Sequence, residues 1–150
     1  MKKEVNILLV EDNEGDIVLT LEALNEAKVS TGIEVVKNGE AALQYLRKEG
    51  IYKNKETPDL ILLDINLPKI NGLEVLIEIK KDVDLMIIPV VMLTTSDSER
   101  DIMESYQHHA NCFISKPVNY QEFIDAVYAI KNFWLDIVQL PNKKNYEPAI

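Results

Sequence analysis

The chain has little of what marks secreted, membrane-spanning or nucleic-acid-binding proteins. Its single cysteine, Cys112, has no partner for an internal disulfide, so we expect a reducing, cytoplasmic location. No signal-peptide segment follows Met1, and no apolar run approaches the roughly 18 residues of a membrane span. The net charge of −9 argues against a nucleic-acid partner, because no basic stripe offsets phosphate repulsion.

The sequence also lacks internal repeats, low-complexity tracts and an interior Gly/Pro-rich linker. These absences leave no place for a second domain within the 150 residues. Hydrophobic residues make up 47% of the chain, which suffices for a core and excludes a disordered chain. We therefore expect one folded domain.

Short apolar runs alternate with helical periodicity five times along the chain. The runs predict strands at 5–10, 33–36, 59–63, 87–93 and 111–115. Helices are expected after each strand, with Ser98 and Asn119 as N-caps of the last two. Parallel strands need helix-length crossovers, so the pattern predicts an α/β fold: a five-stranded parallel sheet flanked by helices.

Polar residues follow four of these strands at the point where each strand ends. Asp64 comes directly after an apolar run, and Glu11 and Asp12 follow the first strand. Thr94 and Lys116 end or follow the fourth and fifth strands. Ligands of open parallel sheets bind outside the carboxyl ends of the strands, so we expect these five side chains to form one site.

The residue types at this edge are those that bind a metal ion and a phosphoryl group. Three crowded carboxylates, from Glu11, Asp12 and Asp64, would repel one another, and Mg²⁺ would remove that conflict. Lys116 supplies a point charge for a phosphate, and Thr94 supplies a hydroxyl. The alternatives are that the first two acids are solvated loop residues, and that Lys116 is a surface lysine or pairs only with Asp64.

Taken together, these residues resemble the receiver domain of two-component response regulators, over about residues 5–135. The resemblance implies a flavodoxin-like (βα)5 receiver fold and a phosphoryl group transferred to Asp64 from a sensor histidine kinase. It implies that Asp12 binds Mg²⁺ directly, that Glu11 assists through water, and that Asn66 contributes its backbone carbonyl. A receiver of this kind is a phospho-acceptor with Mg²⁺-dependent self-phosphorylation and autodephosphorylation, not an enzyme with a separate substrate.

The resemblance also implies a conformational switch. Thr94 and Lys116 would contact the phosphoryl oxygens, and Phe113 stands at the family's aromatic switch position. After phosphorylation Thr94 would move toward the phosphate and Phe113 would turn into the vacated space, which changes the surface of the fourth helix, fifth strand and fifth helix. Thr95 stands where many receivers have Ala, and this bulkier residue restricts the room for Phe113.

The C-terminal segment carries more apolar surface than packing against one domain requires. A helical stripe is expected to run to Pro141, giving a receiver domain at 1–141 and a polar tail at 142–150. The segment 132–141 resembles the end of small single-domain regulators that serve phytochrome-type kinases. That resemblance implies a homodimer formed through a set of four apolar residues: Phe133, Trp134, Ile137 and Leu140.

Three other functions remain as alternatives. An aspartyl-phosphate phosphatase needs an Asp-x-Asp pair, and here the second position is Asn66. A flavodoxin-like cofactor module needs a phosphate-cradling first loop, which Glu11 and Asp12 would repel. No feature of the sequence favours a phosphorylation-independent adaptor, since every residue of the phospho-acceptor site is present. His108 and Cys112 are interpreted as a helix-end residue and a buried core residue.

Overall fold

A computed structural model describes residues 5–27 and 32–142 of the chain. The strands form one parallel sheet in the order β2-β1-β3-β4-β5, as predicted from the βα alternation. The elements follow one another as β1 (Ile7–Val10), α1 (Glu14–Glu26), β2 (Ile33–Val36), α2 (Gly39–Leu46), a 3₁₀ turn η1 (Gly50–Tyr52), β3 (Leu60–Leu63), α3 (Gly72–Lys81), β4 (Val90–Thr94), α4 (Glu99–Gln107), β5 (Cys112–Ser115), α5 (Tyr120–Ile130) and η2 (Lys131–Ile137).

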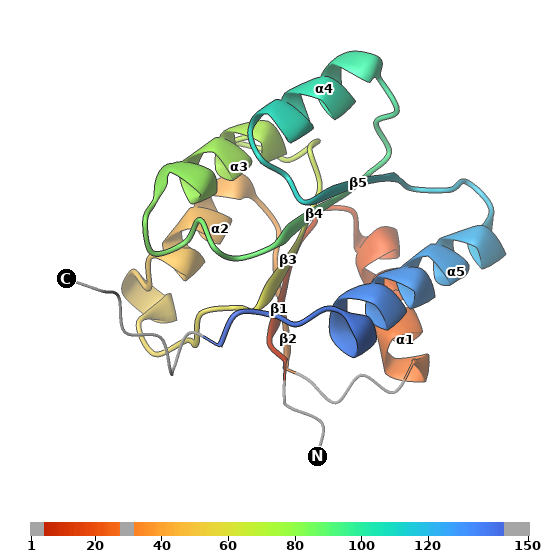
Figure 1. Cartoon of the computed structure of the whole chain (residues 1–150), viewed down its shortest axis with the longest axis horizontal. Helices are drawn as coiled ribbons and strands as arrows, with labels where there is room; N and C mark the ends of the chain where they lie inside the picture. Colours follow the sequence, from red (N-terminus) through yellow and green to blue (C-terminus); the bar gives the residue numbers. More distant parts are fainter. Residues whose placement is uncertain (1–4, 28–31, 143–150) are drawn as a thin grey trace.

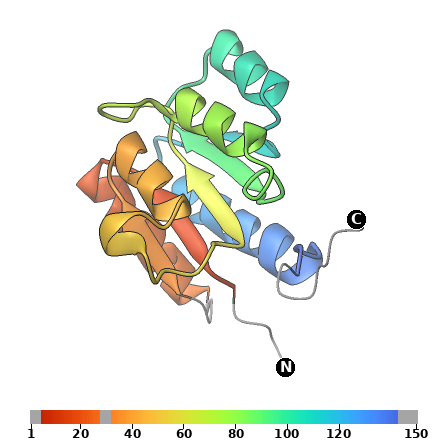
Figure 2. The same cartoon turned by 90° about the vertical axis from the view of Figure 1, so that its left-hand side faces the viewer.

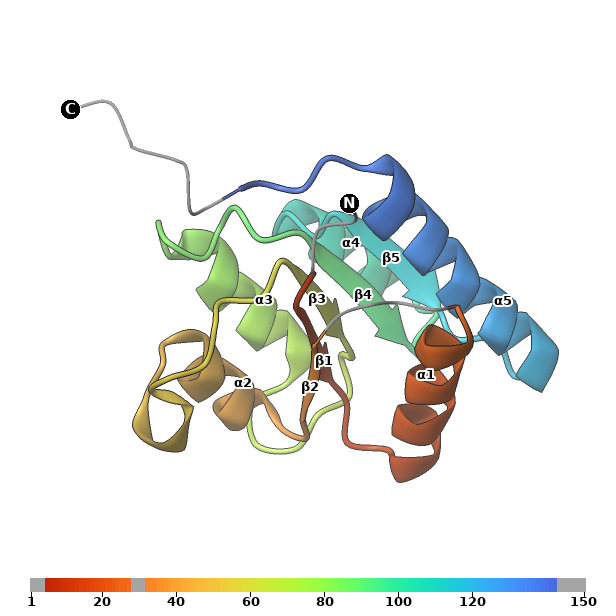
Figure 3. The same cartoon turned by 90° about the horizontal axis from the view of Figure 1, so that it is seen from below.

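The sheet separates two helical layers. Helices α1 and α5 pack together on one face, and α2, α3 and α4 cover the other (Figures 1 and 3). Figure 2 shows α2 and α3 in front of the strands with α5 behind them. Strands β1, β3 and β4 are buried on both faces, which is why they read as unbroken apolar runs.

Every α-helix begins with a side-chain cap. The cap oxygen of Asn13, Asn38, Asn71, Ser98 or Asn119 accepts the backbone N–H three residues further on. The predicted caps Ser98 and Asn119 are confirmed. Helix α1 begins at Glu14, because the Asn13 side chain caps it there.

Two strand predictions near the β5 edge of the sheet are wrong in detail. The fourth strand begins at Val90, not Ile87, because Pro89 has no N–H to donate and Ile87 is nearly half exposed. Lys80 instead holds this segment by donating from Nζ to the carbonyl oxygens of Met86 and Ile88. Cys112, expected to be buried, is half-buried because β5 is the edge strand.

The predicted single helix from 120 to Pro141 is also wrong. Helix α5 ends at Ile130 and continues as η2, a π-helical segment, after which Val138 is extended. The wider π turn brings Lys131 Nζ and Asp136 Oδ2, five residues apart, to 2.7 Å. Of the predicted polar tail, residues 143–150 lie outside the described part of the chain.

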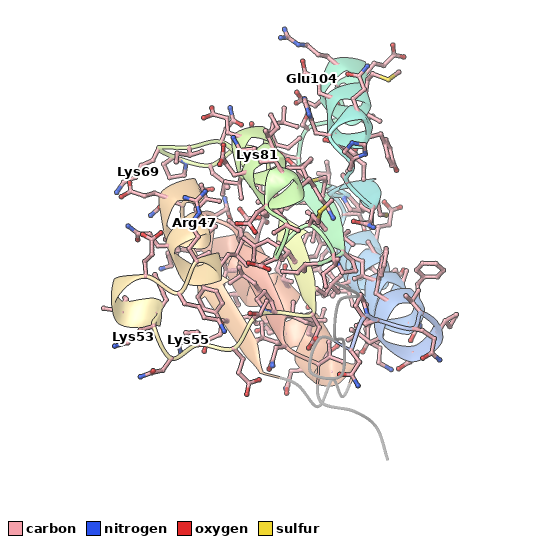
Figure 4. The ribbon with its side chains drawn as sticks, turned by 60° about the vertical axis from the view of Figure 1, so that its left-hand side comes forward. Arg47, Lys53, Lys55, Lys69, Lys81 and Glu104 are labelled. Atoms are coloured by element: carbon pink, nitrogen blue, oxygen red, sulfur yellow. The ribbon has the colours of Figure 1, made fainter. Side chains whose placement is uncertain are left out.

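Basic side chains gather on the α2–η1–α3 side of the molecule, where Figure 4 labels Arg47, Lys53, Lys55, Lys69 and Lys81. Several of them pair with acids, as Arg47 and Lys81 do with Glu78.

Helix α1 has the opposite charge to this basic side of the molecule, because it carries four acidic residues and no basic one. No helix in 5–27 or 32–142 has the length and apolarity needed to cross a membrane.

Gly72 lets α3 begin directly against the backbone that follows β3. A Cβ at this position would stand 2.0 Å from the Asp64 carbonyl oxygen and 2.7 Å from Ile65 Cα. The Gly72 N–H donates to the Ile65 carbonyl at 2.8 Å. The loop after Asp64 is therefore clamped by a backbone-to-backbone contact that any side chain would break.

We expect Gly72→Ala to lower the free energy of unfolding by about 2 kcal/mol, because the added methyl group overpacks against backbone that cannot move aside. Urea denaturation measures the change. Gly15→Ala is the matched control, since its Cβ would meet only Asn13 Oδ1 at 3.3 Å inside a helix. Equal stability of the two variants would contradict the clamp at Gly72.

Candidate functional site

The register of the sheet brings the predicted strand-end residues together. Val10 pairs with Leu63, so the residues that follow them, Glu11 and Asp64, emerge side by side from β1 and β3. Thr94 pairs with Ser115, so Lys116 leaves β5 beside the end of β4, and its N–H donates to the Thr94 carbonyl at 2.7 Å. Strand pairing thus places Glu11, Asp64, Thr94 and Lys116 at one edge of the sheet.

Three carboxylates meet at this edge. One oxygen from each of Glu11, Asp12 and Asp64 lies within 4.8 Å of the other two. Glu11 and Asp64 are buried, whereas Asp12 is exposed to solvent. Oxygen ligands of this kind, with one side open to water, suit a hard divalent cation that keeps several waters.

Lys116 lies within this group of acids and is buried, with 4% of its side chain exposed. Its ammonium contacts three carboxylates: Glu11 Oε1 directly, Asp16 Oδ2 at 2.9 Å and Asp64 Oδ2 at 3.7 Å. The alternatives of a surface lysine and of a lysine that pairs only with Asp64 are therefore wrong. The contact with Asp64 is the longest of the three.

Asp16 was missed by the sequence analysis. It stands in the first turn of α1, which places it beside Lys116. The signal was present in the sequence, where Glu14 and Asp16 follow Glu11 and Asp12, but only the acids directly after the strand were assigned to the site.

Burial and the ammonium act on Glu11 in opposite directions. Burial raises the pKa of Glu11 to about 7, although its hydrogen bond with Lys116 lowers it. Its second oxygen, Oε2, accepts the backbone N–H groups of Asp12 and Asn13 at 3.1 and 3.2 Å. Burial alone would lower the pKa of Lys116, but hydrogen bonds to Glu11 and Asp16 and the charge of Asp64 outweigh it and raise that pKa.

Asp64 is buried at the base of the site. Its Oδ1 accepts the backbone N–H of Asn66 at 3.3 Å, which turns the loop back over the carboxylate. The Asn66 side chain donates to Thr95 Oγ1 at 3.4 Å, so the loops after β3 and β4 are in contact. The metal role of the Asn66 carbonyl stays a prediction.

The residues expected to form a switch lie in one connected region. Thr94 is fully buried, and its hydroxyl accepts the Ser96 N–H at 3.4 Å. Phe113 is half-buried and packs against the core on the α2–α3 side of the sheet. Its N–H donates to the Tyr106 hydroxyl of α4 at 3.1 Å, a link that no sequence pattern signalled.

The sequence pattern of the response regulator receiver domain matches residues 7–128, which is most of the chain. The chain belongs to this family. The predicted fold and the resemblance are thereby confirmed, and the acidic site described above occupies the edge of the sheet in a receiver domain.

Several response regulators are similar to this receiver over most of its length, and one of them is named as a phytochrome response regulator. Response regulator Rcp1 of Synechocystis sp. PCC 6803 is 45% identical over 135 residues, covering 90% of this chain and 92% of Rcp1. The phosphorylated cyanobacterial phytochrome response regulator RcpA gives a TM-score of 0.91 at 48% identity, covering 93% of this chain and 100% of that one. The Mn²⁺-bound form of Rcp1 gives 0.89 at 44%, covering 91% and 99%.

We expect Lys116→Met to lower the free energy of unfolding by about 3 kcal/mol in the presence of a chelator, because it leaves buried carboxylates without their cation. Urea denaturation measures the loss. Lys37→Met is the control: Lys37 pairs with the exposed Glu14, and its removal costs less than about 1 kcal/mol. A Lys116→Met variant as stable as Lys37→Met would show that the ammonium does not hold the acids together.

Proposed function

We propose that this receiver accepts a phosphoryl group on Asp64 from a sensor histidine kinase. The observation that carries the proposal is the position of Asp64: a buried carboxylate with Glu11, Asp12 and Lys116 around it, at the carboxyl edge of the sheet. Family membership supports it, because phosphoryl acceptance is the role of such receivers.

In the transfer, an Asp64 carboxylate oxygen forms a bond to phosphorus while the P–N bond of the kinase phosphohistidine breaks. Asp64 then carries an acyl phosphate, and the histidine leaves with a proton from solvent. Lys116 offsets the negative charge of the transferring group from 3.7 Å, within a small movement of direct contact. The Thr94 hydroxyl, now bonded to the Ser96 N–H, can turn to a phosphoryl oxygen.

The metal site is proposed on the same residues. Asp12 and Asp64, with the Asn66 carbonyl, would hold Mg²⁺, and Glu11 would assist. When bound, the cation neutralises charge on the phosphoryl oxygens. The presence of Mn²⁺ in the Rcp1 structure supports a divalent cation here, and the all-oxygen donor set suits Mg²⁺.

The output is proposed to be a change in the α4–β5–α5 surface. Thr94 and Lys116 are joined by a backbone hydrogen bond, and Ser115 Oγ donates to the Ser96 carbonyl at 3.1 Å. Movement of Thr94 toward a phosphate therefore pulls on both the β4–α4 loop and β5. Phe113 carries that movement to α4 through the Tyr106 hydroxyl.

The kinase partner is proposed to be of the phytochrome type, and the setting cytoplasmic. The similarity to RcpA, which is named as a phytochrome response regulator, covers 93% of this chain and supports the first point. The lone, half-buried Cys112 thiol supports the second. The function would then be a phosphorelay step between the kinase and whatever the altered surface binds.

A homodimer is proposed to form through η2 and the residues after it. Phe133 and Ile137 are exposed by 52% and 69%, so both present apolar surface to solvent. Trp134 lies partly against the core and stacks edge-on with Phe133 at 5.4 Å between ring centres. Leu140 is half-buried. Phe133 and Ile137 therefore offer more exposed apolar surface than Trp134, which packs against Phe133 and the core.

We expect incubation with acetyl phosphate and Mg²⁺ to add the mass of one phosphoryl group to the wild type and none to Asp64→Asn. Intact-mass spectrometry measures the addition, with purified kinase as the second donor. Asp84→Asn, which alters an exposed acid in the α3–β4 loop, is the control and should be labelled normally. Chelation of the metal should abolish labelling. A labelled Asp64→Asn protein, or a wild type labelled by neither donor, would overturn the assignment.

We expect Ile137→Ser to raise the dissociation constant of the homodimer at least about tenfold, since a desolvated aliphatic anchor is worth roughly 1.4 kcal/mol or more. Sedimentation velocity over a concentration series measures it. Ile51→Ser is the control, because Ile51 is 87% exposed but lies in η1. If both variants self-associate as strongly as the wild type does, η2 is not part of the interface.

A further inference from the structure

Lys116 is shared among three carboxylates that differ in one respect. Glu11 and Asp64 belong to the group able to hold a divalent cation, and Asp16 does not. A lysine and a cation therefore compete for Glu11 and Asp64, while Asp16 is left to Lys116 alone. The proposed transfer mechanism gives Asp16 no role of its own.

Local structure fixes Asp16 independently of the metal site. Its backbone N–H is accepted by the Asn13 cap at 2.9 Å, and its carbonyl accepts the hydroxyl of the buried Thr20 at 2.7 Å. The first turn of a helix favours a carboxylate, because free N–H groups point toward it. The Asp16 oxygen thus stands 2.9 Å from Lys116 Nζ in a position set by α1.

We propose that Asp16 is a positioning residue for Lys116, which holds the ammonium to the α1 side and so leaves Glu11 and Asp64 to a divalent cation. This inference rests on the proposed metal site. Without Asp16, the ammonium has only Glu11 and Asp64 as partners and settles between them. A cation entering the site would then have to displace a buried positive charge.

The test is calorimetric titration of the full chain with Mg²⁺, repeated with Mn²⁺. We expect Asp16→Asn to raise the metal dissociation constant at least about threefold more than Glu14→Gln does. Glu14 is the matched control, because it lies in the same helical turn and loses the same charge but pairs with Lys37. Asp16→Glu, which keeps the charge, should retain most of the wild-type affinity.

The same substitutions made in the Lys116→Met variant separate the positioning of Lys116 by Asp16 from a general loss of negative charge. In Lys116→Met, the added effect of Asp16→Asn should fall to that of Glu14→Gln, because there is no ammonium left to place. An effect that persists would overturn the inference, as would equal effects of Asp16→Asn and Glu14→Gln in the wild type. Far-UV circular dichroism checks the fold, and Asp16→Ser replaces Asp16→Asn if that variant does not fold.

The two proposals fail in different ways. A wild type that binds neither metal would overturn the metal site and this inference together. A wild type that binds Mg²⁺ while Asp16→Asn matches the control would overturn only the role of Asp16.

Discussion

The structure depends on keeping several carboxylates close together without unfolding the edge of the sheet. Parallel pairing of β1 with β3 forces Glu11 and Asp64 to emerge as neighbours, and both are buried. Two neighbouring carboxylates repel each other strongly in a buried site, where the dielectric constant is low. The buried ammonium of Lys116, brought in from the far strand β5, offsets that repulsion. Register, strand order and helix start all serve to bring one lysine to these acids.

The three acids of the metal-competent group are not equivalent, and burial separates their roles. Asp12 is open to water and free to exchange solvent for a ligand. Glu11 is inside, and both of its oxygens are engaged, one by Lys116 and one by two backbone N–H groups. Asp64 has the looser contact with Lys116, and it is the group proposed to react. A site built this way keeps the proposed nucleophile, Asp64, less tightly paired with Lys116 than Glu11 is.

The sequence was sufficient for features that follow from period and strand order. Alternating runs and helices predicted the parallel sheet, and strand ends predicted which side chains would meet. It was insufficient for the residue at which a helix begins or changes its winding. Asp16 was overlooked because α1 begins three residues before its first buried residue, Ile17. The π turn of η2 was missed because Phe123, Val127 and Ile130 fit an ordinary helix, and nothing local marks where the winding widens.

The Tyr106 hydroxyl has a consequence for how this sheet meets other polypeptides. An edge strand offers unpaired backbone groups on which another strand can grow. At β5 the phenol of Tyr106 already occupies the N–H of Phe113, and at the opposite edge the Lys55–Glu34 ion pair places charge on β2. Each border of the sheet thus carries one feature that disfavours strand addition. Because Tyr106 belongs to α4, a displacement of that helix would take the acceptor away from the Phe113 N–H and open one backbone donor at the β5 border.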